Sequence, residues 1–276
     1  MSNTLLITRE GACEHWTLND PASRNALSEA MVEALFAACA RATQDGSLRF
    51  IVLQGAGRTF CAGGSLGGFA KSIGQALKPG EGDPLIAMNA RFGELLLALC
   101  QLPQVLVAAV EGAAMGGGFG LVCCADFVLA TDSAVFATPE VTLGVVPAQI
   151  APFVQWRLGD KAARALLLTG AKHSAAQMQT LGLVDAVVSS EGSGAVNGIV
   201  DNEVLAAEVQ QRIASLRVVA PQAVAASKRL LFMPFMPLAN VITTQAAIEF
   251  AASLRSPECA EGLNAFAQKR KARWAA

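Results

Sequence analysis

The spacing of hydrophobic residues predicts alternating strands and helices along the first two thirds of the chain. Apolar residues between 29 and 42 recur every three or four positions, as in an amphipathic helix, and Ser28 is placed to cap it. Runs rich in β-branched residues at 50–54 and 105–110 are typical of buried strands. Two shorter runs around Gly11 predict a hairpin. The remaining predictions are strands at 127–130, 135–136 and 186–188 and a helix over 87–101.

The order of these elements predicts an α/β protein. Residues 105–130 form a strand, a glycine-rich turn, a helix and a strand, which is one right-handed crossover unit of a parallel sheet. Residues 63–83 are rich in Gly and Pro and predict a loop or lid. The polar segment 189–198 predicts a boundary between an α/β core, residues 1–198, and a helical C-terminal region, residues 199–276. In that region helices are predicted over 203–216, 221–231, 238–253 and 257–271.

Composition and charge exclude several classes of protein. Hydrophobic residues make up 53% of the 276 residues and charged residues 16%, which excludes a disordered chain, and the net charge of −1 offers no basic field for nucleic acid. The longest apolar stretch, 112–125, is too short for a membrane span, and the first residues lack the pattern of a secretory signal. The seven cysteines have no metal-ligand spacing. We therefore expect a cytoplasmic protein with reduced thiols and with no metal, nucleic-acid or membrane partner.

Three catalytic motifs are matched only in part. Residues 63–67 fit the G-x-S-x-G pattern of a serine hydrolase, but that pattern must directly follow a strand and needs a later histidine. The preceding predicted strand ends at 54, and His173 lies in a polar turn. The glycines at 116–120 lack the spaced third glycine of a dinucleotide-binding turn, and no phosphate-binding loop motif is present. These patterns therefore favour none of the three chemistries.

Two glycine-rich turns, residues 59–64 and 115–118, each come after a buried strand, and the second begins a helix. Glycine allows the backbone to approach a ligand closely, and a helix start leaves N–H groups unpaired. Two such N–H groups that converge on one point would stabilise an oxyanion. The same glycines would also allow close packing of strand on helix, so for either turn alone both interpretations stay open.

Six segments in order resemble the enoyl-CoA hydratase/isomerase (crotonase) superfamily, and the resemblance covers nearly the whole chain. LNDPASRNALS and RTFCAGGSL are similar to the CoA-binding and first glycine segments of the family. AAVEGAAMGGGFGLVCCAD is similar to its second glycine segment, and FATPEVTLGVVP to the segment that carries an acid. TGAKHSAAQMQTLGLVDAVV and FAQKRKARW match two later segments. Each pattern is weak by itself, but the six together in order are specific.

The resemblance implies a spiral of ββα turns with a helical C-terminal region that packs at a trimer interface, in a homotrimer or a hexamer of paired trimers. It implies an acyl-CoA thioester as substrate, with CoA as part of the substrate and no separate cofactor. The thioester carbonyl would be polarised by the backbone N–H groups of Gly64 and Gly117. The residues that the resemblance assigns to CoA binding are Ala22, Ser23, Arg24, Ala62, Gly63, Ser65 and Leu66, with Arg24 as a partner for the CoA phosphates.

The departures from the family pattern concern the acids. Hydratases of the family have one glutamate just after the glycine run and another about twenty residues later; here these positions are Gly120 and Glu140. Ser65 stands where the family has an aspartate. The resemblance makes Glu140 the acid/base, although a glutamate after a proline is also common in the first turn of a helix. The apolar residues that follow Glu140 predict a raised pKa for its carboxyl group.

A single acid leaves three functions open. The first is a hydratase that adds water to an α,β-unsaturated CoA thioester, the second a Δ3,Δ2-enoyl-CoA isomerase, and the third an acyl-CoA binding protein with little catalysis. Residues 116–121, 147–153 and 268–274 also resemble hydratases of branched glutaconyl-CoA esters such as isohexenylglutaconyl-CoA. A small Gly120 would leave room for a bulky acyl chain. Gln149 either holds a water molecule or faces solvent at the start of a helix.

Overall fold

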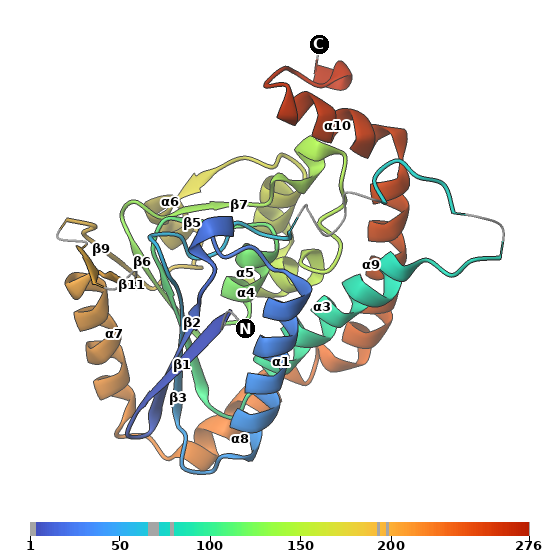
Figure 1. Cartoon of the computed structure of the whole chain (residues 1–276). Coiled ribbons are helices and arrows are strands. Elements are labelled where there is room, and N and C mark those ends of the chain that lie inside the picture. Colours follow the sequence, from blue (N-terminus) through green and yellow to red (C-terminus); the bar gives the residue numbers. More distant parts are fainter. Residues whose placement is uncertain (1–3, 66–71, 78–79, 192–193, 197–198, 276) are drawn as a thin grey trace.

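The computed structural model describes residues 4–65, 72–77, 80–191, 194–196 and 199–275. Its centre is a main sheet with the strand order β1-β2-β3-β4-β6-β9 (Figure 1). β1 and β2 form the predicted antiparallel hairpin, and every later pair in this sheet is parallel. The strands are β1 (Leu5–Glu10), β2 (Cys13–Leu18), β3 (Phe50–Gly55), β4 (Val105–Val110), β6 (Phe127–Thr131) and β9 (Ala186–Val188).

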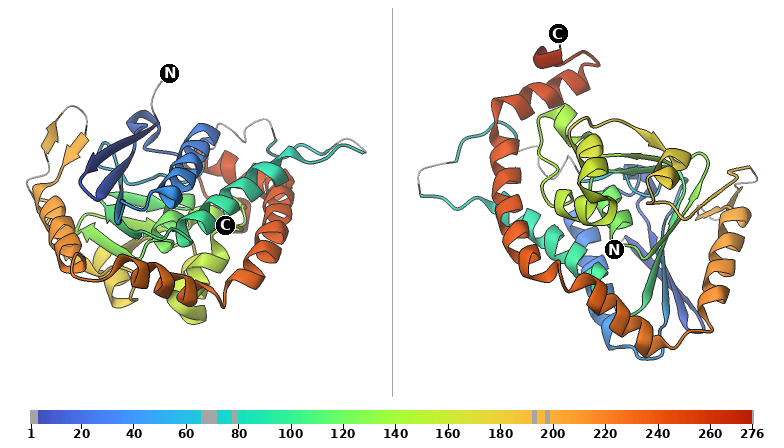
Figure 2. Two further views of the ribbon diagram at one scale, coloured as in Figure 1. Left: turned by 90° about the horizontal axis from the view of Figure 1, so that it is seen from below. Right: turned by 180° about the vertical axis from the view of Figure 1, so that it is seen from behind.

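Helices cover both faces of the main sheet, which explains why its central strands β3, β4 and β6 are mainly hydrophobic. On β3, Ile51 and Leu53 pack in the same core as the apolar faces of α1 (Glu29–Gln44) and α3 (Pro84–Cys100). The alternate residues Phe50 and Val52 pack with α7 (Glu203–Leu216) on the opposite face. Figures 1 and 2 show these two helical layers with the sheet between them. The period of two along each strand thus divides the core into two layers.

A second, small sheet produces the spiral that the resemblance implied. β4 is followed by β5 (Ala113–Met115) and α4 (Gly117–Cys123). β6 is followed by β7 (Val135–Ala137), the 3-10 helix η2 (Pro139–Leu143) and α5 (Ala151–Leu167). In the small sheet, β7 pairs with β5 on one side and with β8 (His173–Ser174) on the other. Each turn therefore places one strand in each sheet before its helix, which confirms the crotonase-type fold. β5 and β8 were not predicted, because three and two residues show no periodicity.

The C-terminal third is mainly helical, as predicted. The elements are α6 (Ala175–Thr180), β10 (Gly194–Val196), β11 (Ile199–Asp201), α8 (Pro221–Phe232), α9 (Met236–Arg255), α10 (Pro257–Ala267) and η3 (Arg273–Ala275). β10 lies in the segment predicted as a domain boundary and pairs antiparallel with β11, which follows that segment. α7 contacts the main sheet and α9 contacts α3, and the division at residue 198 stays a prediction. Within the described ranges, no helix is both long and apolar enough to cross a membrane.

The chain before α3 is tied to α9 by an ion pair. Asp83 caps α3 by accepting a hydrogen bond from the Leu85 N–H at 3.0 Å, and the helix begins three residues before the predicted start. Arg255 of α9 donates two hydrogen bonds to the same carboxylate, at 2.5 and 2.7 Å. A third donation from Arg255 reaches the Gln75 carbonyl at 2.8 Å. Residues 66–71 and 78–79 of the predicted lid lie outside the described residues.

Candidate active site

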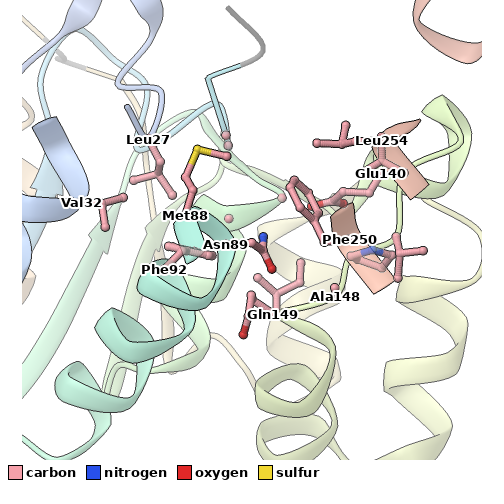
Figure 3. Close-up of a pocket in the computed structure, with 18 of the residues that line it drawn as sticks. Leu27, Val32, Met88, Asn89, Phe92, Glu140, Ala148, Gln149, Phe250 and Leu254 are labelled. Carbon is pink, nitrogen blue, oxygen red and sulfur yellow. The ribbon is translucent and has the colours of Figure 1, made fainter. Parts of the chain in front are cut away.

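A cavity of about 680 Å³ lies between α1, α3, α9 and the two glycine-rich turns (Figure 3). Most of its wall is apolar, which suits an acyl chain. The apolar side chains that line it include Leu27, Val32, Met88, Phe92, Leu143, Val145, Ile150, Phe250 and Leu254. The polar side chains that line it are few, and in the interior they are Glu140, Asn89 and Gln149.

Backbone hydrogen bonds hold the two glycine-rich turns together. The Cys61 N–H donates to the Ala113 carbonyl, and the Met115 N–H donates to the Cys61 carbonyl, both at 2.9 Å. Gly63 has a φ of +95°, and a methyl group on its Cα would lie 3.0 Å from the Met115 carbonyl oxygen and 3.7 Å from the Gly116 Cα. Only glycine fits this contact without strain. The turns are therefore neighbours, although some fifty residues separate them.

Gly64 and Gly117 both line the cavity. Gly117 is the first residue of α4, and no side chain caps that helix. In the part of the chain that the structure describes, neither the Gly64 N–H nor the Gly117 N–H donates a hydrogen bond. These are the two N–H groups that the resemblance assigns to the thioester carbonyl.

Glu140 is held beside the second turn by η2. One carboxylate oxygen, Oε1, lies 2.6 Å from where a methyl group on Gly116 would be. The other, Oε2, is fully buried and has no hydrogen-bond partner among the described residues. Burial raises the pKa of the Glu140 carboxyl group from 4.5 to about 7, which confirms the predicted direction. A carboxyl group with this pKa can both take and give a proton near neutral pH.

The raised pKa predicts how activity depends on pH. If Glu140 acts first as a base, it must be ionised, so kcat/KM should rise as the pH increases through about 7. At pH 5 only about 1% of the carboxyl group is ionised, and kcat/KM should be about 100-fold below its plateau. A pH–rate profile of the wild-type protein measures this. A profile that stays level from pH 5 to pH 8 would contradict the assignment.

The segments predicted to bind CoA lie side by side. The Ala62 N–H donates to the Arg24 carbonyl at 3.0 Å, the Leu27 N–H donates to the Gly63 carbonyl at 2.8 Å, and the Ser65 N–H donates to the Leu27 carbonyl at 3.3 Å. Ala62 and Gly63 line the cavity. Ala22, Ser23 and Arg24 are exposed beside it in and after η1 (Pro21–Ser23), Ser65 does not line it, and Leu66 lies outside the described residues.

Asn25 orders this region, although no motif in the sequence singled it out. The side chain is fully buried, and its amide nitrogen donates to the carbonyls of Ala56 and Thr59 at 2.8 and 2.7 Å. Its amide oxygen accepts from the Asp20 N–H at 2.9 Å. Asn25 also adopts a left-handed backbone, with a φ of 56°. Asparagine tolerates that conformation better than most residues. An asparagine within the turn-rich segment 19–25 is therefore the sequence signal that could have indicated this position.

The position of the missing acid is filled by another side chain. A methyl group on Gly120 would lie 2.5 Å from Ile150 Cγ2 and 3.7 Å from Leu96 Cδ1, and Gly120 does not line the cavity. The prediction that Gly120 leaves extra room for an acyl chain is therefore wrong, because Ile150 occupies that space. The interpretation of Gln149 as solvent-facing is also wrong, since only 2% of the surface of Gln149 is exposed.

Comparison with known proteins agrees with this geometry. The sequence profile of the enoyl-CoA hydratase/isomerase family matches residues 8–276, so the chain belongs to that family. A mevalonyl-coenzyme A hydratase, SIDH, from Beauveria bassiana is 32% identical over 94% of this chain and 89% of its own.

Two solved structures resemble the whole chain. An enoyl-CoA hydratase/isomerase from Marinobacter aquaeolei is 40% identical, with a TM-score of 0.75 and 99% of both chains covered. Pseudomonas aeruginosa AtuE is 39% identical, with a TM-score of 0.76 over 99% of this chain and 100% of its own. The chain spans about half the length of the first curated relatives that it matches, 48% of one and 57% of another.

Proposed function

We propose that this protein adds water across the double bond of an α,β-unsaturated CoA thioester. The observation that carries the proposal is one buried carboxylate, Glu140, packed against a glycine turn next to two unpaired backbone N–H groups. The family is one of CoA-thioester enzymes, and a relative similar over most of the chain is named a hydratase. The same arrangement can move protons, stabilise an enolate and exclude bulk water.

The proposed reaction uses one carboxylate for both proton transfers. The thioester oxygen accepts hydrogen bonds from the Gly64 and Gly117 N–H groups, which stabilise negative charge on it. Glu140 takes a proton from water as the oxygen of that water bonds to the β-carbon, and the electrons of the double bond move to the thioester oxygen. The resulting enolate then takes the proton from Glu140 at its α-carbon. Water is added in full, and Glu140 returns to its ionised state.

A Δ3,Δ2-enoyl-CoA isomerase is the second candidate, and Ile150 favours it. A side chain larger than hydrogen at position 120 would collide with Ile150, so the second carboxylate of a two-acid hydratase has no place here. One carboxylate is sufficient to carry a proton from the γ-carbon to the α-carbon. An acyl-CoA binding protein with little catalysis is the third candidate, because the same cavity would bind the thioester without turnover.

Assays with 2-enoyl-CoA and 3-enoyl-CoA esters of equal length test these candidates. A hydratase consumes the 2-enoyl ester with loss of its conjugated absorbance, whereas an isomerase converts the 3-enoyl ester to the conjugated 2-enoyl ester. We expect the first result. If the protein converts only the 3-enoyl ester, the hydratase proposal is wrong and the protein is an isomerase. Tight binding in calorimetry without conversion of either ester would leave only a binding protein.

For the substrate, we propose a branched acyl chain whose CoA moiety follows Ala22, Ser23, Arg24 and residues 62–66. The support is the cavity of about 680 Å³ and the sequence resemblance to hydratases of branched esters.

The exposed Arg24 lies beside Ala62, whose N–H donates to the Arg24 carbonyl, and a phosphate group of CoA could pair with the Arg24 side chain there. An Arg24→Ala variant should raise the KM for the CoA ester more than it changes kcat. An unchanged KM would exclude this role.

We also propose that the chain assembles as a homotrimer or as a pair of trimers. The end of α8 exposes Leu230, Leu231 and Met233 by 64, 73 and 58%, and Phe266 of α10 is 66% exposed. Neighbouring exposed apolar side chains, such as the three at the end of α8, are typical of a protein–protein interface. Sedimentation velocity would give the mass of the assembly, and a monomer at micromolar concentration would exclude the proposal.

A further inference from the structure

Two amide side chains in the cavity have polar atoms that the proposed reaction does not use. Seven buried side-chain atoms have no hydrogen-bond partner in the described parts of the chain, and three of these belong to residues that line the cavity. One is Glu140 Oε2, which the reaction explains. The others are Asn89 Oδ1 and Gln149 Oε1. Buried polar atoms without a partner are costly, so a pair of them in a ligand cavity points to a ligand group.

The orientation of the Gln149 amide is fixed by its surroundings. Its nitrogen, Nε2, donates to the Thr243 carbonyl of α9 at 2.9 Å. The reverse orientation would place two oxygens against each other, so Oε1 must be the free end. The atom that Gln149 leaves without a hydrogen-bond partner is therefore an acceptor, Oε1.

Gly93 brings Gln149 close to α3, the helix that carries Asn89. Asn89 and Gly93 are one turn apart on the same face of α3. A methyl group on Gly93 would lie 2.3 Å from Gln149 Oε1, so only glycine lets α3 approach this amide. Glycine inside a helix costs about 1 kcal/mol relative to alanine, and the close approach accounts for its presence. Figure 3 shows Asn89 projecting from α3 beside Gln149.

We propose that Asn89 and Gln149 form a polar subsite that binds a hydroxyl group on the acyl chain of the substrate. A hydroxyl group donates one hydrogen bond and accepts others. Gln149 Oε1 would accept its proton, and the Asn89 amide can turn to donate to its oxygen. A carboxylate only accepts, so Gln149 would oppose it, and a methyl group would leave both amides without partners. The inference rests on the proposed function and adds the class of acyl chain to it.

Three 2-enoyl-CoA esters of equal length, ending in a methyl, a hydroxymethyl or a carboxylate group, test the subsite. The three esters are compared at each of several chain lengths. At one of these lengths we expect the kcat/KM of the wild-type protein to be at least about tenfold higher for the hydroxymethyl ester than for the other two. In Asn89→Leu and Gln149→Met, which keep the size of each side chain, the preference should fall below about twofold. Gln155→Met, an exposed glutamine on α5, is the matched control and should keep the preference.

The ratio between esters separates this inference from the others. A wild-type protein without preference, or variants that keep the preference, would overturn it. An equal loss on all three esters would show that the amides hold a water molecule instead, and this too would overturn it. If Gln149→Met fails to fold, Asn89→Leu still gives the answer, because Asn89 Oδ1 has no protein partner to lose. Failure of the wild-type protein to convert any ester would contradict the proposed function itself.

Discussion

We expect Glu140→Gln to lower kcat by about 10³-fold while binding of a CoA ester changes little. Glutamine has nearly the shape of glutamate, so the cavity keeps its form, but an amide cannot take a proton from water or return one to the α-carbon. Stopped assays for kcat and calorimetry with a non-reactive acyl-CoA measure the two quantities separately. The matched control is Glu29→Gln, an exposed carboxylate that lines the same cavity at the start of α1 and should stay within about twofold of wild type.

The stability of Glu140→Gln shows whether the loss is chemical. The pKa of Glu140 in the folded protein, about 7, lies above its ordinary value of 4.5. The folded state therefore binds the proton more tightly than the unfolded state, and the free energy of unfolding falls as the pH rises from 4.5 to 7. Glutamine does not titrate, so the variant does not show this fall. Between pH 4.5 and 7 its free energy of unfolding should therefore rise by up to about 3 kcal/mol relative to that of wild type. If the variant is less stable than wild type at pH 8, its loss of activity is due to unfolding and not to the missing carboxylate.

Gly116→Ala should lower kcat/KM by about 100-fold. Gly116 has a φ of +50°, and an alanine Cβ would lie 2.6 Å from Glu140 Oε1. The carboxylate is the more mobile partner, so it should move, and a displacement of about 1 Å at a catalytic group costs about 10²-fold. The backbone strain, about 1–3 kcal/mol, would also shift the start of α4 and with it the Gly117 N–H. Steady-state kinetics together with thermal unfolding measure both effects.

Gly46→Ala is the matched control for this substitution. Gly46 is exposed, its φ is not in the left-handed region, and an added methyl group would meet no atom within 4 Å. It should keep wild-type kinetics. If Gly116→Ala were as active as Gly46→Ala, the contact between Gly116 and Glu140 would have no part in the reaction.

Most of the architecture could be predicted because it depends on local patterns. The hydrophobic runs in β3 and β4 predicted buried strands, and the structure has them within one residue of the expected ends. The three-to-four spacing of α1 and its Ser28 cap were also confirmed. Of the small sheet, β7 was predicted, but β5 and β8 could not be, because their pairing comes from segments far apart in the chain.

The sequence by itself determined the family, the two glycine-rich turns and Glu140, since each lies in a contiguous motif. Only the tertiary structure decided which polar residues meet inside the cavity. Gln149 is fixed by a carbonyl of α9, and that carbonyl belongs to Thr243, 94 positions further along the chain. Ile150 occupies the space beside Gly120, and α3, which carries Asn89, comes this close to Gln149 only because residue 93 is glycine. A side chain's burial and partners depend on which distant segments pack against it, and no spacing along the chain records that.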